Sequence, residues 1–147
     1  MNTIAALLLS LYLSFNIAEP AKPAPARVVV KITDIRSSSG NLKLGLYKEQ
    51  TAFEDETPLL KKTVNKTGIS GGVVSCDMFL EPGNYGIALL DDENNDGEMD
   101  YGFLLPDEGF GFSNYYHTGF SKPKLKNFTF TVTHGQTAYV TIKVKYM

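Results

Sequence analysis

A short acidic loop in the middle of the chain contains the side chains best suited to bind a ligand. It spans positions 91–100 and reads Asp-Asp-Glu-Asn-Asn-Asp-Gly-Glu-Met-Asp. Side chains with oxygen atoms recur at Asp92, Asn94 and Asp96, and Gly97 follows. This spacing matches the first half of a calcium loop of the EF-hand kind, in which positions one, three and five supply oxygens and a glycine at position six allows a sharp turn. The acidic loop therefore predicts a calcium site.

The remaining ligands of such a site are less regular. Glu98 would offer its backbone carbonyl, and Asp100 falls at position nine. Position twelve should be a bidentate Glu, but here it is Phe103, and the loop follows an apolar run that indicates a strand rather than a helix. A residue from elsewhere in the chain must then complete the shell.

The charge distribution supports a cation. The acidic loop and the segment after it contain half of the chain's 16 acidic residues, namely Asp91, Asp92, Glu93, Asp96, Glu98, Asp100, Asp107 and Glu108. No Lys or Arg occurs between Lys66 and Lys122 to neutralise them. Like charges packed into one loop repel unless a cation or full solvation relieves them. The alternative is a solvated acidic turn, in which Asn and Asp serve turn geometry alone.

The composition describes the domain that must position this loop. A length of 147 residues indicates one domain, and 43% hydrophobic residues allow a real core. The net charge is −2 and no basic patch with interleaved aromatics occurs, so nucleic acid is not an expected partner. The single cysteine, Cys76, excludes an intrachain disulfide, and its alternation with apolar neighbours predicts a buried small hydrophobe rather than a nucleophile.

The N-terminal region differs from the rest. An apolar run at 4–15 has the length of a signal peptide and is too short to span a bilayer comfortably. We expect a signal peptide at 1–18, a Pro/Ala-rich linker at 19–26 and a β-sandwich domain at 27–147. The protein is then predicted to be exported, periplasmic or extracellular, without a membrane span after signal cleavage.

Short alternating segments with turns between them predict an all-β fold. The expected strands are 28–35, 42–46, 61–67, 73–80, 85–90, 128–132 and 140–146. A turn of helix is expected at 51–56, a hairpin loop at 37–41, and a type II turn at 81–84 that would make strands 73–80 and 85–90 a hairpin ending in the acidic loop. Segment 101–127 is rich in glycine and aromatics and is expected to be irregular. About seven strands favour an antiparallel two-sheet β-sandwich, immunoglobulin-like in layout.

Three motifs resemble the domain of unknown function 2141 family, a family of exported bacterial proteins. They are Pro82-Gly83-x-Tyr85, then Asp91-x-Glu93-Asn94-x-x-Gly97-x-x-Asp100, then Pro106-x-Glu108-Gly109-x-Gly111-Phe112-Ser113-Asn114. The resemblance covers residues 28–144. It implies a compact β-sandwich comparable to transthyretin-like modules, and it supplies neither an established activity nor catalytic residues.

The resemblance also suggests why a glycine-rich segment accompanies the acidic loop. We expect Glu108, or its neighbour Asp107, to fold back and close the cation site, with Phe110 and Phe112 packing beneath it. Plain core packing is the alternative role for these two rings. The full predicted ligand set is Asp92, Asn94, Asp96, Glu98, Asp100 and Glu108.

Sequence signals for an enzyme are weak. A Ser113–His117–Asp arrangement has no nucleophile-elbow sequence behind it, and no phosphate loop, dinucleotide fingerprint or zinc spacing occurs. We therefore expect an exported non-catalytic module that binds a divalent cation and an envelope glycan or protein. The alternative is a small periplasmic hydrolase of the transthyretin-like type. Such enzymes use clustered His and Arg, whereas this chain has two of each at scattered positions.

Overall fold

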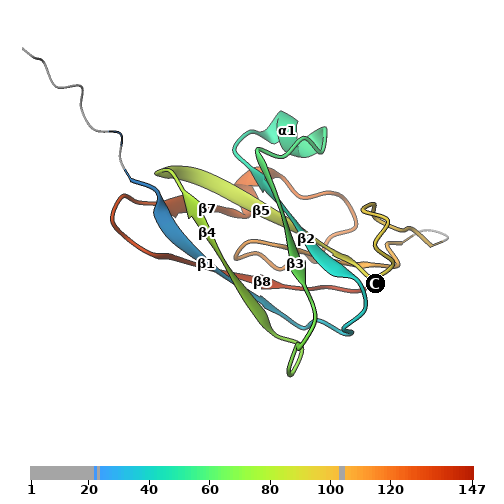
Figure 1. The fold of residues 1–147 in the computed structure, drawn as a ribbon. Helices are drawn as coiled ribbons and strands as arrows, with labels where there is room; N and C mark the ends of the chain where they lie inside the picture. Colours follow the sequence, from blue (N-terminus) through green and yellow to red (C-terminus); the bar gives the residue numbers. More distant parts are fainter. Residues whose placement is uncertain (1–21, 23, 103–104) are drawn as a thin grey trace, which may run out of the picture.

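The computed structural model describes residues 22, 24–102 and 105–147. The predicted signal peptide, half of the predicted linker and Phe103 lie outside them. The described residues form two β-sheets packed face to face (Figure 1), so the prediction of an all-β sandwich is confirmed. The elements are β1 (Ala26–Thr33), β2 (Asn41–Tyr47), α1 (Gln50–Glu54), β3 (Leu60–Asn65), β4 (Val74–Leu80), β5 (Gly83–Asp92), β6 (Gly109–Phe112), the short 3-10 helix η1 (Leu125–Asn127), β7 (Thr129–Val132) and β8 (Ala138–Lys143). None of the helices in the described ranges is long and apolar enough to cross a membrane.

The first sheet has the order β4-β1-β8 and the second has the order β3-β2-β5. The free side of β5 pairs with two strands in succession, β7 along Gly83–Gly86 and β6 along Ala88–Asp91. All pairs are antiparallel except β1 with β8, which is parallel. The fold is therefore an antiparallel sandwich with one parallel pair and eight strands. The strand that the sequence did not predict is β6.

The core lies between the sheets and follows from side-chain alternation along each strand. Every second residue of the central strands points inward and is buried; these are Val28, Val30 and Ile32 of β1, Leu42, Leu44 and Leu46 of β2, Tyr85, Ile87 and Leu89 of β5, and Val140 and Ile142 of β8. Burial of this apolar surface is the main force that holds the sheets together. Cys76 is half-buried and packs against this core, as its parity predicted.

A second apolar cluster covers the outer face of β5. It consists of Tyr47, Phe53, Phe112, Leu125 and Phe128. The rings of Phe112 and Phe128 have centroids 4.9 Å apart, and those of Phe53 and Phe128 are 5.0 Å apart and edge to face. Phe110 is half-buried and packs against this cluster, so both predicted phenylalanines pack on the sheet that leads into the acidic loop.

Strand β6 also joins the two sheets along one side. Phe110 N donates to Lys145 O at 3.0 Å, and Lys145 N donates to Phe110 O at 2.8 Å. Just beyond β6, Asn114 N donates to Thr141 O at 2.8 Å. We call this line of bonds between β6 and the β8 region the seam.

Both predicted hairpins are wrong. The loops at 37–41 and 81–84 connect strands that lie in different sheets, because β1 and β4 belong to the first sheet and β2 and β5 to the second. Gly83 has a φ of 157°, far from the value of about +80° that a type II turn needs. At the first loop, Gly40 has a φ of 69°, and a Cβ there would meet Asp92 O at 1.9 Å. Alternation shows which face of a strand is buried but not which sheet the strand joins.

Candidate functional site

The acidic loop begins where β5 ends, at Asp92. This residue points to the outer face of its sheet and is fully buried. Its Oδ2 accepts a hydrogen bond from Gly97 N at 3.1 Å and lies 3.8 Å from Lys43 Nζ. Its Oδ1 is buried and has no hydrogen-bond partner among the described residues. One oxygen of a buried carboxylate is therefore left without a donor.

The loop folds through a series of short bonds between its own residues. Asn94 Oδ1 accepts from Asp96 N at 2.9 Å, and Asp96 Oδ1 accepts from Glu98 N at 2.9 Å. The Asn94 amide nitrogen donates to Asp96 Oδ2 at 2.9 Å and to Asp100 Oδ2 at 2.7 Å. Gly97 has a φ of 84°, which explains the glycine at this turn. The loop therefore brings Asn94, Asp96 and Asp100 together, whereas the Glu98 side chain is exposed.

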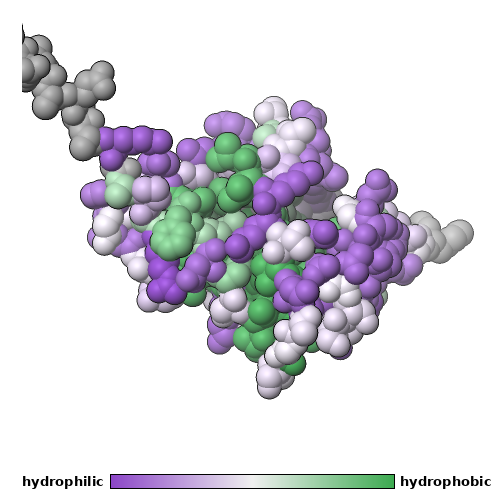
Figure 2. Space-filling model, in the orientation of Figure 1, coloured by the Kyte–Doolittle hydropathy of each residue, from purple (hydrophilic) through white to green (hydrophobic). Residues whose placement is uncertain are grey.

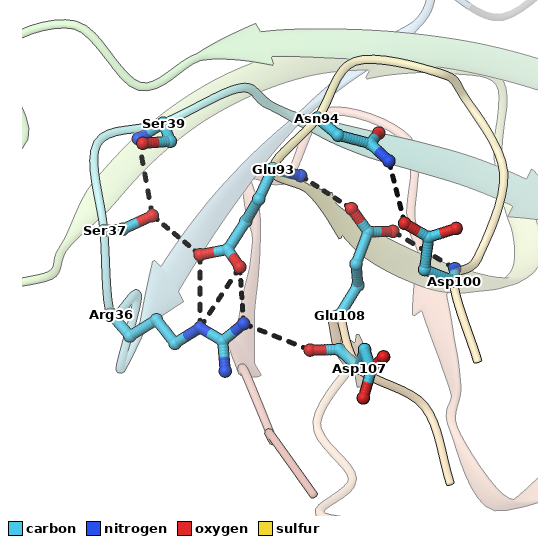
Figure 3. A pocket seen from close by; sticks show the side chains of 8 residues that line it. All are labelled: Arg36, Ser37, Ser39, Glu93, Asn94, Asp100, Asp107 and Glu108. Carbon is cyan, nitrogen blue, oxygen red and sulfur yellow. Dashed lines mark hydrogen bonds and ion pairs between the residues drawn. The ribbon is translucent and has the colours of Figure 1, made fainter. Parts of the chain in front are cut away.

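Glu108 folds back onto the acidic loop, as expected (Figure 3). Its Oε1 accepts from Glu93 N at 2.9 Å and its Oε2 from Asp100 N at 3.4 Å, so one carboxylate connects the two ends of the loop. It is 4% exposed. Burial raises the pKa of Glu108 above its ordinary value of 4.5, and repulsion from Asp100 and Asp92 raises it further.

Asp107 behaves differently from its neighbour. Its backbone N donates to Asp100 O at 2.9 Å and its backbone O accepts from Arg36 Nη2 at 3.1 Å, while its side chain is exposed. The closing carboxylate is therefore Glu108, and Asp107 contributes backbone contacts.

Within the described ranges, no three His, Cys, Asp or Glu side chains stand in the arrangement of a metal centre. In this conformation the Asn94 amide nitrogen, and not a cation, holds Asp96 and Asp100 together. Calcium binding stays a prediction at this point.

The expectation that no basic residue neutralises the acidic region is wrong. Arg36 forms a two-nitrogen pair with Glu93, whose Oε2 lies 2.5 Å from Nη2, and Ser37 Oγ donates to Glu93 Oε1 at 2.7 Å. Hydrogen bonds from Arg36 are the main cause of a pKa of Glu93 below 4.5. A second cation, Lys66, forms an ion pair with Asp91. Both cations are distant from the acidic residues in the sequence, but the segments that follow β1 and β3 bring them to the end of β5.

These groups surround an open depression of about 490 Å³ beside the acidic loop (Figure 3). It is lined by Arg36, Ser37, Ser39, Glu93, Asn94, Asp100, Asp107 and Glu108. The depression is polar, and its charged walls come from three separate segments of the chain.

A second polar group lies on the inner face of β5, and sequence reasoning missed it. Lys66 and Asp91 are both 0% exposed and form an ion pair. Tyr146 Oη donates to Asp91 Oδ2 at 2.5 Å and accepts from Arg36 N at 3.0 Å. Burial and the bond to Asp91 raise the pKa of the Tyr146 phenol. We call Lys66, Asp91 and Tyr146 the inner cluster. Alternation along the strands was the signal in the sequence. Lys66 lies two positions after the inward-facing Val64, and Tyr146 lies two positions after the inward-facing Val144.

The hydroxyl and imidazole of the Ser113–His117 pair are each bound elsewhere. Ser113 Oγ donates to Phe128 O at 2.5 Å and accepts from Ile87 N at 2.9 Å. His117 Nε2 lies 2.6 Å from Ser121 O. The buried Ser113 thus fastens η1 to β5.

Residues 30–140 match the family described as "Uncharacterized protein conserved in bacteria (DUF2141)". The chain belongs to this family. Comparisons with curated proteins and with solved structures give no match. The sequence resemblance to this family is thus confirmed, and the family description names no activity.

Proposed function

We propose that the protein is an exported, non-catalytic β-sandwich module whose acidic loop binds calcium. The observation on which this depends is Asp92 Oδ1, a buried carboxylate oxygen without a partner among the described residues. Leaving such a group unsatisfied costs about 1–3 kcal/mol, more when it is charged. A hard divalent cation with a preference for oxygen ligands would remove that cost.

The loop geometry supports the same ligand. Asp92, Asn94 and Asp96 have the spacing of calcium-loop positions one, three and five, and the bond from Gly97 N to Asp92 turns the loop back over its first residue. Asn94 would present its oxygen in place of its NH₂ group, and Asp96 and Asp100 would follow. Glu98 would contribute its backbone carbonyl, and Glu108 would supply the carboxylate that position twelve lacks.

The bound cation would stiffen one end of the sandwich and present a surface to an envelope glycan or protein. Tyr101, the residue directly after the acidic loop, is an exposed aromatic side chain at this end. Apolar side chains also gather over β3 and β4, flanked by hydrophilic ones (Figure 2); the exposed members there include Leu59, Leu60, Val73 and Phe79. A periplasmic or extracellular location suits this role, because calcium is available there at higher levels than in the cytoplasm.

Calorimetric titration with calcium tests the proposal. Wild type should bind, Asp92→Asn should lose binding, and Glu108→Gln should weaken it by at least tenfold. Glu98→Gln is the matched control, because it removes a carboxylate from the same loop but keeps the backbone carbonyl, and its affinity should stay close to wild type. No binding by wild type, or equal binding by Asp92→Asn, would rule out the site.

Thermal unfolding gives an independent measurement. A ligand that binds only the folded state stabilises it by mass action, about 2.7 kcal/mol at a hundred times Kd. Calcium should therefore raise the melting temperature over that in chelator. Magnesium should do so less, since it requires a stricter octahedral shell.

A further inference from the structure

We propose that Lys66 and Asp91 are joined by a covalent amide bond between Nζ and Cγ, formed within the folded protein. This proposal is independent of calcium binding and concerns the inner cluster alone. The amide would tie β3, an edge strand, to β5 at the centre of the same sheet, across β2.

The sheet brings the Lys66 and Asp91 side chains together. Lys66 follows the last residue of β3, and Asp91 is the penultimate residue of β5. Leu42 of β2 pairs with Asp91 on one side and with Val64 on the other, so Lys66 reaches across the end of β2 to meet the carboxylate. Nζ is in contact with Asp91 Oδ1, and the carbon to be attacked is one bond further. Groups held at contact distance react as if at very high concentration.

The hydrogen bonds available to the Lys66 ammonium also favour an amide over an ion pair. A buried ammonium has three protons to donate. Among the described residues, Asp91 Oδ1 is the one acceptor within hydrogen-bond distance of Lys66 Nζ. Two protons of a fully buried cation are then unmatched, which is unfavourable in an apolar interior. An amide carries a single N–H and no charge, so it fits this environment better than the ion pair does.

The surroundings suit the reaction. In a site closed to water, a proton passes from the ammonium to the carboxylate and leaves a neutral amine and a carboxylic acid. The Nζ lone pair attacks Cγ, the C–N bond forms, the C–Oδ1 bond breaks, and Oδ1 departs with two protons as water. Nothing is oxidised or reduced. Tyr146 Oη donates to Oδ2 at 2.5 Å, where negative charge gathers during the attack, and Oδ2 remains as the amide oxygen.

The sequence makes the test simple. Trypsin cleaves after Lys66 only if its side chain is free, and there is no Lys or Arg between Lys66 and Lys122. Because Lys122 precedes a proline, the next cleavage falls after Lys124. A digest of the unlinked protein contains peptides 63–66 and 67–124. The linked protein gives instead one continuous peptide, 63–124, which the amide closes into a loop and which is lighter by one water.

The experiment is intact-mass and tryptic mass spectrometry of the purified full chain. We expect an intact mass one water below the mass calculated for the unlinked chain. Fragment ions of peptide 63–124 should place the cross-link between Lys66 and Asp91. The free peptides 63–66 and 67–124 at full yield would overturn the proposal.

Lys66→Arg is the control, because arginine keeps the charge but cannot form the bond. The variant should have the full mass. Loss of water that persists in Lys66→Arg would point to cyclisation at Asp96–Gly97 and would count against the amide. The digest of wild type decides the question even if the variant fails to fold.

Discussion

Asp91 and Asp92 are adjacent at the end of β5, yet they point to opposite faces of the sheet and have opposite surroundings. Both are fully buried. Asp91 has a partner on each oxygen, Lys66 on one and Tyr146 on the other. Asp92 accepts from Gly97 on one oxygen, and its other oxygen has no hydrogen-bond partner among the residues that the structure describes. Protein groups complete the inner carboxylate, whereas the outer one is completed on one oxygen only.

Two buried acidic residues that are adjacent in the sequence can therefore differ in their role. On the inner face of β5, Asp91 and Lys66 form a buried ion pair, which is the pair that we propose to be linked by an amide. Outside, Asp92, Asp100 and Glu108 repel one another and raise the pKa of Glu108. Four substitutions test the difference between the two carboxylates, and their expected effects on stability differ widely.

Lys66→Met should have the largest effect. It leaves Asp91 charged, buried and without its cation, which costs about 3–5 kcal/mol when a buried pair is broken. Chemical denaturation should show the loss as a lower midpoint. The double variant Lys66→Met, Asp91→Leu should regain much of it, because no lone charge then remains. A single variant as stable as wild type would show that Asp91 does not depend on Lys66.

Asp92→Asn should have an intermediate effect of opposite sign. Without calcium it should stabilise the fold by about 1–2 kcal/mol, because a buried charge with an unsatisfied oxygen disappears. In calcium it should lose the gain in melting temperature that wild type shows. Thermal unfolding in chelator and in calcium measures both. Destabilisation in chelator would mean that the outer carboxylate is already satisfied.

Glu108→Gln should change stability by less than Asp92→Asn does, and the change should depend on pH. The raised pKa means that the folded state binds this proton more tightly than the unfolded state does. The stability that Glu108 contributes is therefore present below about pH 4.5 and is lost as pH rises through the raised pKa.

In chelator, the stability of wild type relative to Glu108→Gln should fall as the pH rises above about 4.5 and through the raised pKa, by less than the Asp92→Asn effect. Calcium should reverse this trend, because an ionised Glu108 would then face a cation. Denaturant midpoints over a pH series measure the difference. A difference that is flat with pH would contradict the repulsion.

Arg27→Ala should have the smallest effect. Arg27 pairs with Asp77 at 2.7 Å on an exposed sheet face, and such pairs are worth at most about 1 kcal/mol. The loss should shrink further in high salt. A cost as large as that of Lys66→Met would mean that burial does not explain the difference between the two pairs.

Much of the fold could be predicted because alternation is local. The inward leucines of β2 and the inward valines and isoleucines of β1 and β8 show it directly in the sequence. Sheet membership could not be predicted, since the loops at 37–41 and 81–84 read as hairpins while the core requires them to cross between sheets. Strand β6 was missed because Gly-Phe-Gly-Phe has glycines where strands favour branched residues.

The candidate site was predictable in part for the same reason. The spacing of Asp92 and Gly97 is a local signal, and the bond between them follows from it. The partners of Asp91 were not predictable, because Lys66 and Tyr146 are 25 and 55 positions away and only packing brings them together. Arg36 was missed likewise, although it is central to the depression beside the loop.

The seam has a consequence for association with other chains. On its side of the sandwich, the bonds of Phe110 with Lys145 and of Asn114 with Thr141 already occupy part of the backbone at β6 and β8. On the other side, β3 and β4 each have one neighbouring strand within the described residues, so their outer backbone groups are free to accept an added strand. Lys61 and Lys62 on β3 discourage a second copy from docking there by charge repulsion. A partner that recruits this protein by extending a sheet can therefore pair with the outer edge of β3 or of β4.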